Sequence, residues 1–239
     1  MDISQHKAAK IAGFMFLFSL IIPLVNWTFV LSKLIVEENV ITTANNIMIN
    51  ELLFRIGITT ELFMSFGLIV LALALYILLK PVNKNIALLA LFLKLIEATI
   101  AVVIVLVTFL ALQISNGESY LSVFTAEQLR APVGFLLNEH TVIYSIPMVF
   151  LGLDMIIFSW LFFKSKYIPP VIAGFGIFSF AFILIHSLMY ILAPEYAKLT
   201  INQIIFYAPS GLFEIIIGLW LLFRGVEVQQ KYKHITNKS

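Results

Sequence analysis

Six apolar stretches, each long enough to cross a bilayer, constrain this chain more than any other feature of its sequence. They cover residues 11–31, 52–79, 86–114, 133–163, 171–193 and 203–223. A helix of about 20 apolar residues spans the hydrocarbon core, where every backbone polar group must find its hydrogen-bond partner inside the protein. We therefore expect an all-α integral membrane bundle of six transmembrane helices, built as a single membrane domain over residues 1–239.

The composition indicates lipid as the solvent of this chain. Hydrophobic residues make up 61% and charged residues 12% of the sequence, whereas about a quarter of the residues of a soluble domain are charged. The basic residues are dispersed, which does not suggest a nucleic-acid partner. There is no cysteine, so disulfides, thiolate metal sites and a cysteine nucleophile are excluded. The lipid bilayer is the expected partner, and the pattern favours no particular oligomeric state.

Lysine and arginine are distributed unequally between the two sides of the predicted bundle. One side holds Lys7, Lys10, Lys80, Lys84, Lys164, Lys166, Arg224, Lys231, Lys233 and Lys238, and the other holds Lys33, Arg130 and Lys198. The positive-inside rule then predicts that both termini and the tight turns "KPVNKN" and "KSKYIPP" are cytoplasmic. We expect a multi-pass protein of the cell membrane with a short polar cytoplasmic tail at residues 224–239.

The segments that flank the spans carry further signals. Lys7 and Lys10 precede the first apolar run as in a signal peptide, but that run lacks a small-residue cleavage site and is expected to be retained as a span. Residues 32–50 and 115–132 form longer, polar connectors. In the second of these connectors, Thr125 and Gln128 have the spacing of a capping box that opens a short surface helix.

Five stretches together are similar to a known family. They are "NELLFRIG" at 50–57, "LLKPVNKNIALLALF" at 78–92, "FTAEQL" at 124–129, "LFFKSKYIPP" at 161–170 and "GLWLLFRGVEV" at 218–228. In this order and at this spacing they resemble a prokaryotic membrane family, domain of unknown function 4386, over residues 7–228. The resemblance implies a protein with several membrane spans, and it brings no activity and no catalytic residue.

Four charged side chains within the spans are expected at one depth in the membrane. Counted at 1.5 Å per residue from the lysine-rich ends of their helices, Lys94 lies roughly 12 Å in, Glu97 roughly 16 Å, and Asp154 and Glu214 roughly 14 Å. A charge at mid-membrane costs about 2.5–3.5 kcal/mol and is tolerated beside a partner or a wet cavity. Small and polar residues share a helix face with each charge. We therefore expect these faces to point inward and to form one polar layer.

The charges of this layer do not balance. One lysine cannot neutralise three carboxylates in a medium of low dielectric constant, so Lys94 should pair with one or two acids. At least one of the acids is then expected to be protonated at neutral pH. The hypothesis that follows is a layer that takes up or releases a proton.

A second, looser group of polar side chains is predicted in the outer half of the spans. It consists of Arg55, Glu61, Glu139, His140 and His186. Two histidines and two acids carry the atoms of a metal site, but no pair of them has the spacing of a metal-binding motif, and the two histidines lie at different depths. We expect no metal and no haem or other cofactor here, and histidines hydrogen-bonded between helices instead.

Three functions are compatible with the polar layer. The first is a binding or transport protein for a proton, an ion or a small polar solute. The second is an intramembrane enzyme that uses Glu97 and Asp154 as an acid pair with Lys94 as electrostatic partner. The chain has no nucleophile motif, phosphate loop or metal cluster, which disfavours an enzyme. The third is a structural or regulatory membrane protein without a ligand, because a buried ion network can also serve to specify helix pairing.

Overall fold

The computed structural model describes residues 3–36, 39–115 and 140–227, together with residues 125, 128, 133 and 136. These residues form helices and no strand. Six helical segments are long and apolar enough to cross a membrane, namely Gln5–Leu34, Glu51–Leu79, Lys84–Ile114, Ile143–Ser165, Pro170–Leu192 and Thr200–Arg224. The structure therefore confirms the predicted all-α bundle with six spans. Its orientation in the membrane stays a prediction.

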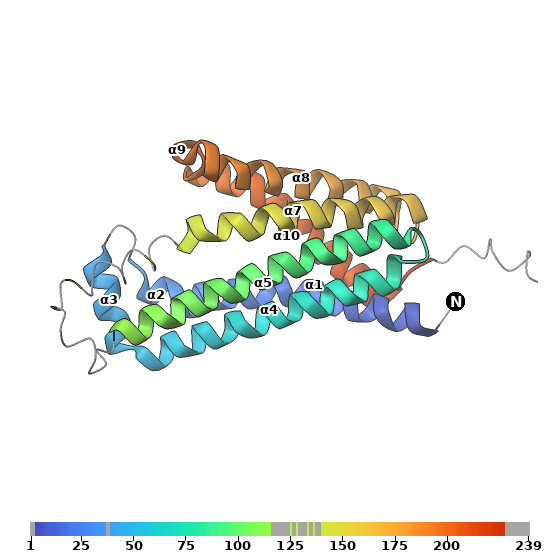
Figure 1. The fold of residues 1–239 in the computed structure, drawn as a ribbon. Helices are drawn as coiled ribbons and strands as arrows, with labels where there is room; N and C mark the ends of the chain where they lie inside the picture. The colour runs from blue at the N-terminus through green and yellow to red at the C-terminus, as the bar shows by residue number, and fades with distance from the viewer. Residues whose placement is uncertain are drawn as a thin grey trace, which may run out of the picture.

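The spans are formed by six long helices with short extensions. They are α1 (Ile3–Asn26), continued by the π-helical turn η1 (Trp27–Leu31) and by α2 (Ser32–Leu34), then α4 (Glu51–Leu79), α5 (Lys84–Ser115), α7 (His140–Ser165), α8 (Pro170–Leu192), and α10 (Thr200–Leu219) with η3 (Trp220–Arg224). The start of α1 and the two tight turns lie at one end of the bundle, which we call the N-terminal end (Figure 1). The short helices α3 (Val40–Ile49) and α9 (Pro194–Ala197) lie at the other, the α3–α9 end.

The helices are arranged as a closed ring around the interior. Each long helix packs against the next along the chain, in the order α1, α4, α5, α7, α8 and α10, and α10 returns to contact α1. Gly13 lies where this ring closes: a Cβ atom built on it would come within 2.6 Å of the Leu222 backbone N and 2.7 Å of the Gly218 carbonyl O. Only glycine permits so close an approach of two helix backbones. The first and the last span are therefore in backbone contact near the N-terminal end.

Two apolar cores occupy the two ends of the bundle. The larger core lies towards the N-terminal end and includes Phe16, Leu75, Phe158 and Phe213. The smaller core includes Leu34, Ile47 and Phe54 from the segments near α3. The buried charged side chains described below lie between these cores along the helices, at mid-span.

Side chains in the connectors cap the helices that follow them. The Asn83 side chain accepts a hydrogen bond from the Ile86 N–H at 3.1 Å and caps α5. In the first long connector, which the sequence predicted only as polar, Asn39 caps the Thr42 N–H at 2.9 Å and α3 follows. Thr125 and Gln128 bond reciprocally at 2.8 and 3.3 Å, as in a capping box. The polar tail beyond residue 227 lies outside the described residues.

Candidate functional site: a cavity with a charged wall

Lys94, Glu97 and Asp154 form one buried ion network. Lys94 and Glu97 are three residues apart on α5 and therefore share a face, and the Lys94 Nζ donates a hydrogen bond to the Glu97 Oε2 at 2.9 Å. Asp154 projects from α7 and its Oδ1 lies 3.3 Å from the same Nζ. The three residues are 1%, 4% and 0% exposed. We call them the ion network.

Asp154 is the least satisfied member of the ion network. Its contact with Lys94 is an ion pair without hydrogen-bond geometry, since neither carboxylate oxygen has a hydrogen-bond partner among the described residues. A buried carboxylate without such partners is costly. Two carboxyl groups thus share one ammonium group in the middle of the bundle, so one of them is left to be balanced by a proton or by a further cation.

A cavity of about 770 Å³ lies beside the ion network. Residues of α1, η1, α4, α5, α7 and α10 line it, and Lys94 and Glu97 form part of its wall. Asp154 is not among the lining residues and lies behind them. This volume is within the range of pockets that hold a drug-sized molecule, about 300–1,000 Å³. The charged layer therefore borders a space large enough for a ligand.

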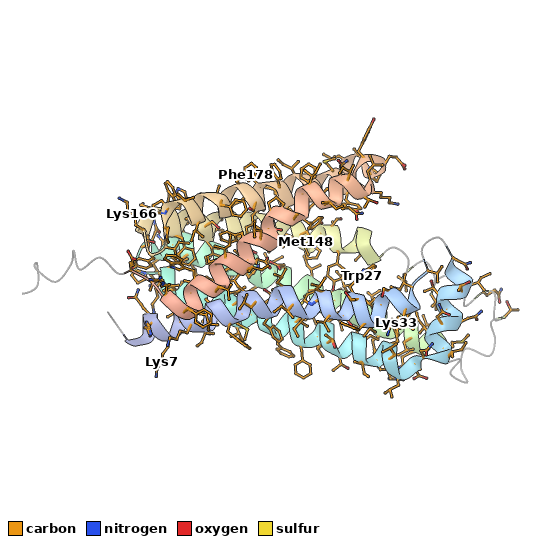
Figure 2. All side chains as sticks on the ribbon, turned by 180° about the vertical axis from the view of Figure 1, so that it is seen from behind. Lys7, Trp27, Lys33, Met148, Lys166 and Phe178 are labelled. Carbon is orange, nitrogen blue, oxygen red and sulfur yellow. The ribbon has the colours of Figure 1, made fainter. Side chains whose placement is uncertain are left out.

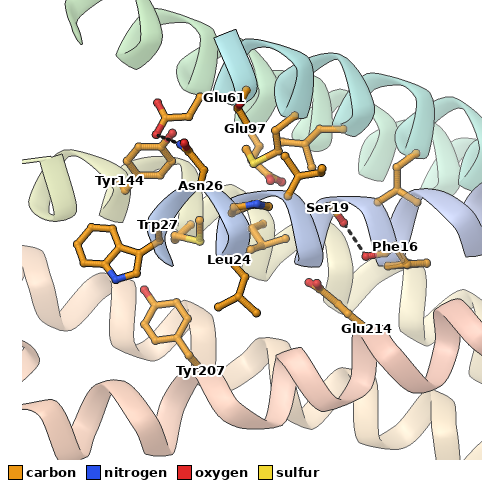
Figure 3. Close-up of a pocket in the computed structure, with 18 of the residues that line it drawn as sticks. Phe16, Ser19, Leu24, Asn26, Trp27, Glu61, Glu97, Tyr144, Tyr207 and Glu214 are labelled. Carbon is orange, nitrogen blue, oxygen red and sulfur yellow. Dashed lines mark hydrogen bonds between the residues drawn. The ribbon is translucent and has the colours of Figure 1, made fainter. Parts of the chain in front are cut away.

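Glu214 reaches the same cavity from α10 (Figure 3). It lies close enough to Lys94 and Glu97 to interact with both electrostatically. It is half-buried because its side chain borders the cavity. No hydrogen bond or ion pair holds its carboxylate within the described part of the chain. The four side chains predicted as a polar layer are thus distributed as a buried ion network of three with Glu214 across the cavity.

The other end of the cavity is built around Glu61, from α4. The Asn26 Nδ2 of α1 lies 3.4 Å from the Glu61 Oε1 and 3.4 Å from the Gly57 carbonyl O. The Tyr144 ring of α7 lies near this pair, and Tyr144 interacts electrostatically with Glu61 (Figure 3). Trp27 and Tyr207 also line the cavity at this end. An acid and three aromatic rings therefore surround the part of the cavity farther from Glu214.

The remaining members of the predicted outer group have separate surroundings. The Arg55 guanidinium pairs with Glu51 at 2.6 Å on the same helix, with both side chains partly exposed. His186 is fully buried, its Nε2 lies 3.2 Å from the Ala197 carbonyl O, and its ring packs against Tyr190 and Tyr207. Glu139 and the His140 side chain lie outside the described residues. Of this group, the structure places Glu61 at the cavity and not Arg55 or His186.

The donor atoms in the described part of the chain do not form a metal site. No three histidine, cysteine, aspartate or glutamate side chains there are grouped so that they could hold a metal ion. In the ion network, the Lys94 ammonium occupies the place beside the two carboxylates that a cation would take. The chemistry that this arrangement supports is the binding of charge and hydrogen-bonding groups.

Asn26 and Trp27 are among the lining residues that the sequence alone did not single out. Asn26 is 3% exposed and Trp27 follows it at the start of η1, a π-helical turn that begins four residues after Pro23. Asn26 was the available signal, because an amide within an apolar span requires a hydrogen-bond partner on a neighbouring helix. Proline interrupts regular helix hydrogen bonding, and π-turns often occur at functional sites. These features together indicated where α1 faces the interior.

Comparisons with known proteins place the chain in a family and go no further. No curated protein and no solved structure matches the chain. The sequence profile of the family described as "Domain of unknown function (DUF4386)" matches residues 11–225, which include most of the first span, the other five spans in full, the ion network and the residues that line the cavity. The chain is a multi-pass membrane protein that belongs to the DUF4386 family.

Proposed function

We propose that this membrane protein binds, and carries across the bilayer, a small polar or ionisable solute or a proton, with the cavity as the binding site. One observation supports this most strongly: a space of about 770 Å³ borders the buried charges Lys94 and Glu97. Intramembrane ionisable groups that face a cavity commonly mark a substrate or ion pathway. An ion network enclosed by packed side chains, with no cavity beside it, would instead be explained by helix packing alone.

The proposal is tested by asking what the purified protein retains. Native mass spectrometry of protein extracted in mild detergent should show a bound small molecule or ion as added mass. In the double variant Lys94→Met/Glu97→Gln, the added mass and any uptake into proteoliposomes should be lost while the protein still elutes as a folded species. The matched control is Arg55→Met/Glu51→Gln, which removes the same charge types from an ion pair outside the cavity.

A structural role is the second candidate, and a specific observation favours it. Lys94 pairs with a carboxylate on its own helix at 2.9 Å and with one on α7 at 3.3 Å, so the ion network joins α5 to α7. Interhelical polar contacts of this kind can fix helix pairing. Under this alternative, the double variant lowers the melting temperature in detergent, and neither it nor the wild type carries added mass.

A further inference from the structure

The cavity opens between α1 and α10, the two helices at which the ring closes. Three of its lining side chains are strongly exposed: Leu24 at 62%, Trp27 at 43% and Ile204 at 57%. The first two belong to α1 and η1 and the third to α10, and Figure 2 shows these helices diverging from their contact towards the α3–α9 end. The mouth of the cavity therefore lies between the first and the last span.

The surface around this mouth is apolar. Ile21 precedes Leu24 by three residues on α1, Ile201 and Ile205 lie within three residues of Ile204 on α10, and each of the three is exposed. Exposed isoleucine and leucine on a membrane-spanning segment contact acyl chains. A molecule that reaches the cavity through this mouth comes from the bilayer, which selects for compounds that partition into lipid.

The charges inside the cavity select for a cation. Glu61, Glu97 and Glu214 line it, and among the lining residues that the structure describes Lys94 is the only cation. Lys94 is already engaged by two carboxylates and is 1% exposed. An anionic ligand would have to displace Glu97 or Asp154 and would meet Glu214 nearby, whereas a cation can take the place of the proton on an acid that Lys94 does not balance.

The aromatic end of the cavity suits an organic cation in particular. Trp27, Tyr144 and Tyr207 line the cavity beside Glu61 (Figure 3). The faces of tryptophan and tyrosine rings attract ammonium groups, and such rings form the cages that recognise quaternary ammonium compounds. Met64, Leu68 and Leu71 provide apolar contacts for the rest of the molecule.

We propose that the ligand of this cavity is a lipophilic organic cation, such as an ammonium compound with an apolar body, that enters from the bilayer between α1 and α10. This inference rests on the proposed function and specifies its substrate class. Glu214 and Glu61 supply the negative charge, the three aromatic rings stack on the ligand, and the ion network forms the wall between the two acids.

The charge preference is tested with two probes of equal shape and opposite charge. Equilibrium dialysis of the purified protein, corrected with protein-free micelles, should show saturable binding of tetraphenylphosphonium and none of tetraphenylborate. Glu214→Gln should weaken tetraphenylphosphonium binding about tenfold or more, because an ionic contact is lost. The control Glu195→Gln, an exposed acid on α9 outside the cavity, should bind as the wild type does.

The route of entry is tested with a single fluorescent reporter. The chain has three tryptophans, so Trp160→Phe/Trp220→Phe leaves Trp27 alone. In liposomes, lipids brominated in the acyl chain should quench Trp27, and tetraphenylphosphonium should reduce that quenching as it fills the mouth. Trp27 that is quenched by aqueous iodide and not by brominated lipid would overturn lateral entry.

The outcomes separate this inference from the proposed function. Equal binding of both probes, or stronger binding of the borate, overturns the cationic class and leaves a ligand-binding cavity in place. Binding of neither probe, with added mass still seen in native mass spectrometry, also overturns the inference alone. No probe binding and no retained mass contradicts both. If Glu214→Gln does not fold, the comparison of the two probes on the wild-type protein still decides the matter.

Discussion

Lys94 of α5 and Asp154 of α7 form an ion pair of 3.3 Å between neighbouring helices, and each of these residues is at most 1% exposed. A buried charge whose partner is removed is strongly destabilising, whereas an exposed pair contributes little. The pair therefore couples the folding of the bundle to the presence of the ammonium group, whatever the cavity binds.

Removing the ammonium group should destabilise the protein. We expect Lys94→Met to lower the free energy of unfolding by about 3 kcal/mol, because it leaves Glu97 and Asp154 together without a cation. Lys94→Met/Asp154→Asn should recover part of this loss. The control Arg55→Met removes a cation from a partly exposed pair and should cost no more than about 1 kcal/mol. Denaturant unfolding in detergent provides the measurement, and equal losses for Lys94→Met and Arg55→Met would contradict the prediction.

A side chain at the backbone contact between α1 and α10 should not be tolerated. Gly13→Ala places a Cβ atom 2.6 Å from the Leu222 N, which is a backbone atom and cannot rotate away. We expect a loss of about 1–3 kcal/mol from overpacking. Gly174→Ala is the matched control, since no heavy atom lies within 4 Å of its added Cβ, and it should leave the melting temperature unchanged or slightly raised. A Gly13→Ala protein as stable as Gly174→Ala would show that the helices are farther apart.

The buried histidine should hold α9 against the end of α8. His186→Leu fills the space between Tyr190 and Tyr207 with an apolar side chain but removes the contact of 3.2 Å with the Ala197 carbonyl O. The expected cost is about 1 kcal/mol for one buried hydrogen bond. Hydrogen exchange should become faster in α9 and at the start of α10 and remain slow in α4. An equal increase in the hydrogen-exchange rate of every helix would instead indicate that the substitution lowers only the global stability.

The orientation of the bundle can be measured directly because the chain contains no cysteine. Lys84→Cys and Lys198→Cys place single thiols at exposed positions on opposite ends of the bundle. The positive-inside rule predicts that a membrane-impermeant maleimide labels Lys198→Cys in intact cells and labels Lys84→Cys only after lysis. The reverse pattern would place both tight turns outside.

The spans, and the common height at which Lys94 and Asp154 meet, could be predicted because both depend on local properties. An apolar run fixes where a helix crosses, and the rise per residue fixes the height of Lys94, Asp154 and Glu214 along it. Which side chains touch depends on helix packing instead. Asp154 contacts Lys94 because α7 packs on α5, while Glu214 faces Lys94 and Glu97 across a cavity because α10 diverges from α1 (Figure 2). Neither crossing is encoded in the periodicity of a single helix.

The same reasoning explains the helix α3 and the position of Trp27. Asn39 and Thr42 have the spacing of a helix cap, but a polar connector gives no apolar periodicity from which to infer the helix that follows. Trp27 lies in a π-turn, where the residues no longer follow the 3.6-residue period used to assign helix faces. Assigning helix faces to residues 27–31 by the 3.6-residue period therefore places their side chains on the wrong side of the helix.

The close approach at Gly13 gives the mouth of the cavity a mechanical property. Two helices in backbone contact at one point can change their separation elsewhere mainly by tilting about that point, which then acts as a fulcrum. Leu24 lies eleven residues farther along α1, a lever arm of about 16 Å at 1.5 Å per residue. A tilt of about 10° about Gly13 would move Leu24, at the edge of the mouth, by roughly 3 Å. Small rotations of α1 and α10 about this contact would thus change the width of the entrance that we propose for the ligand.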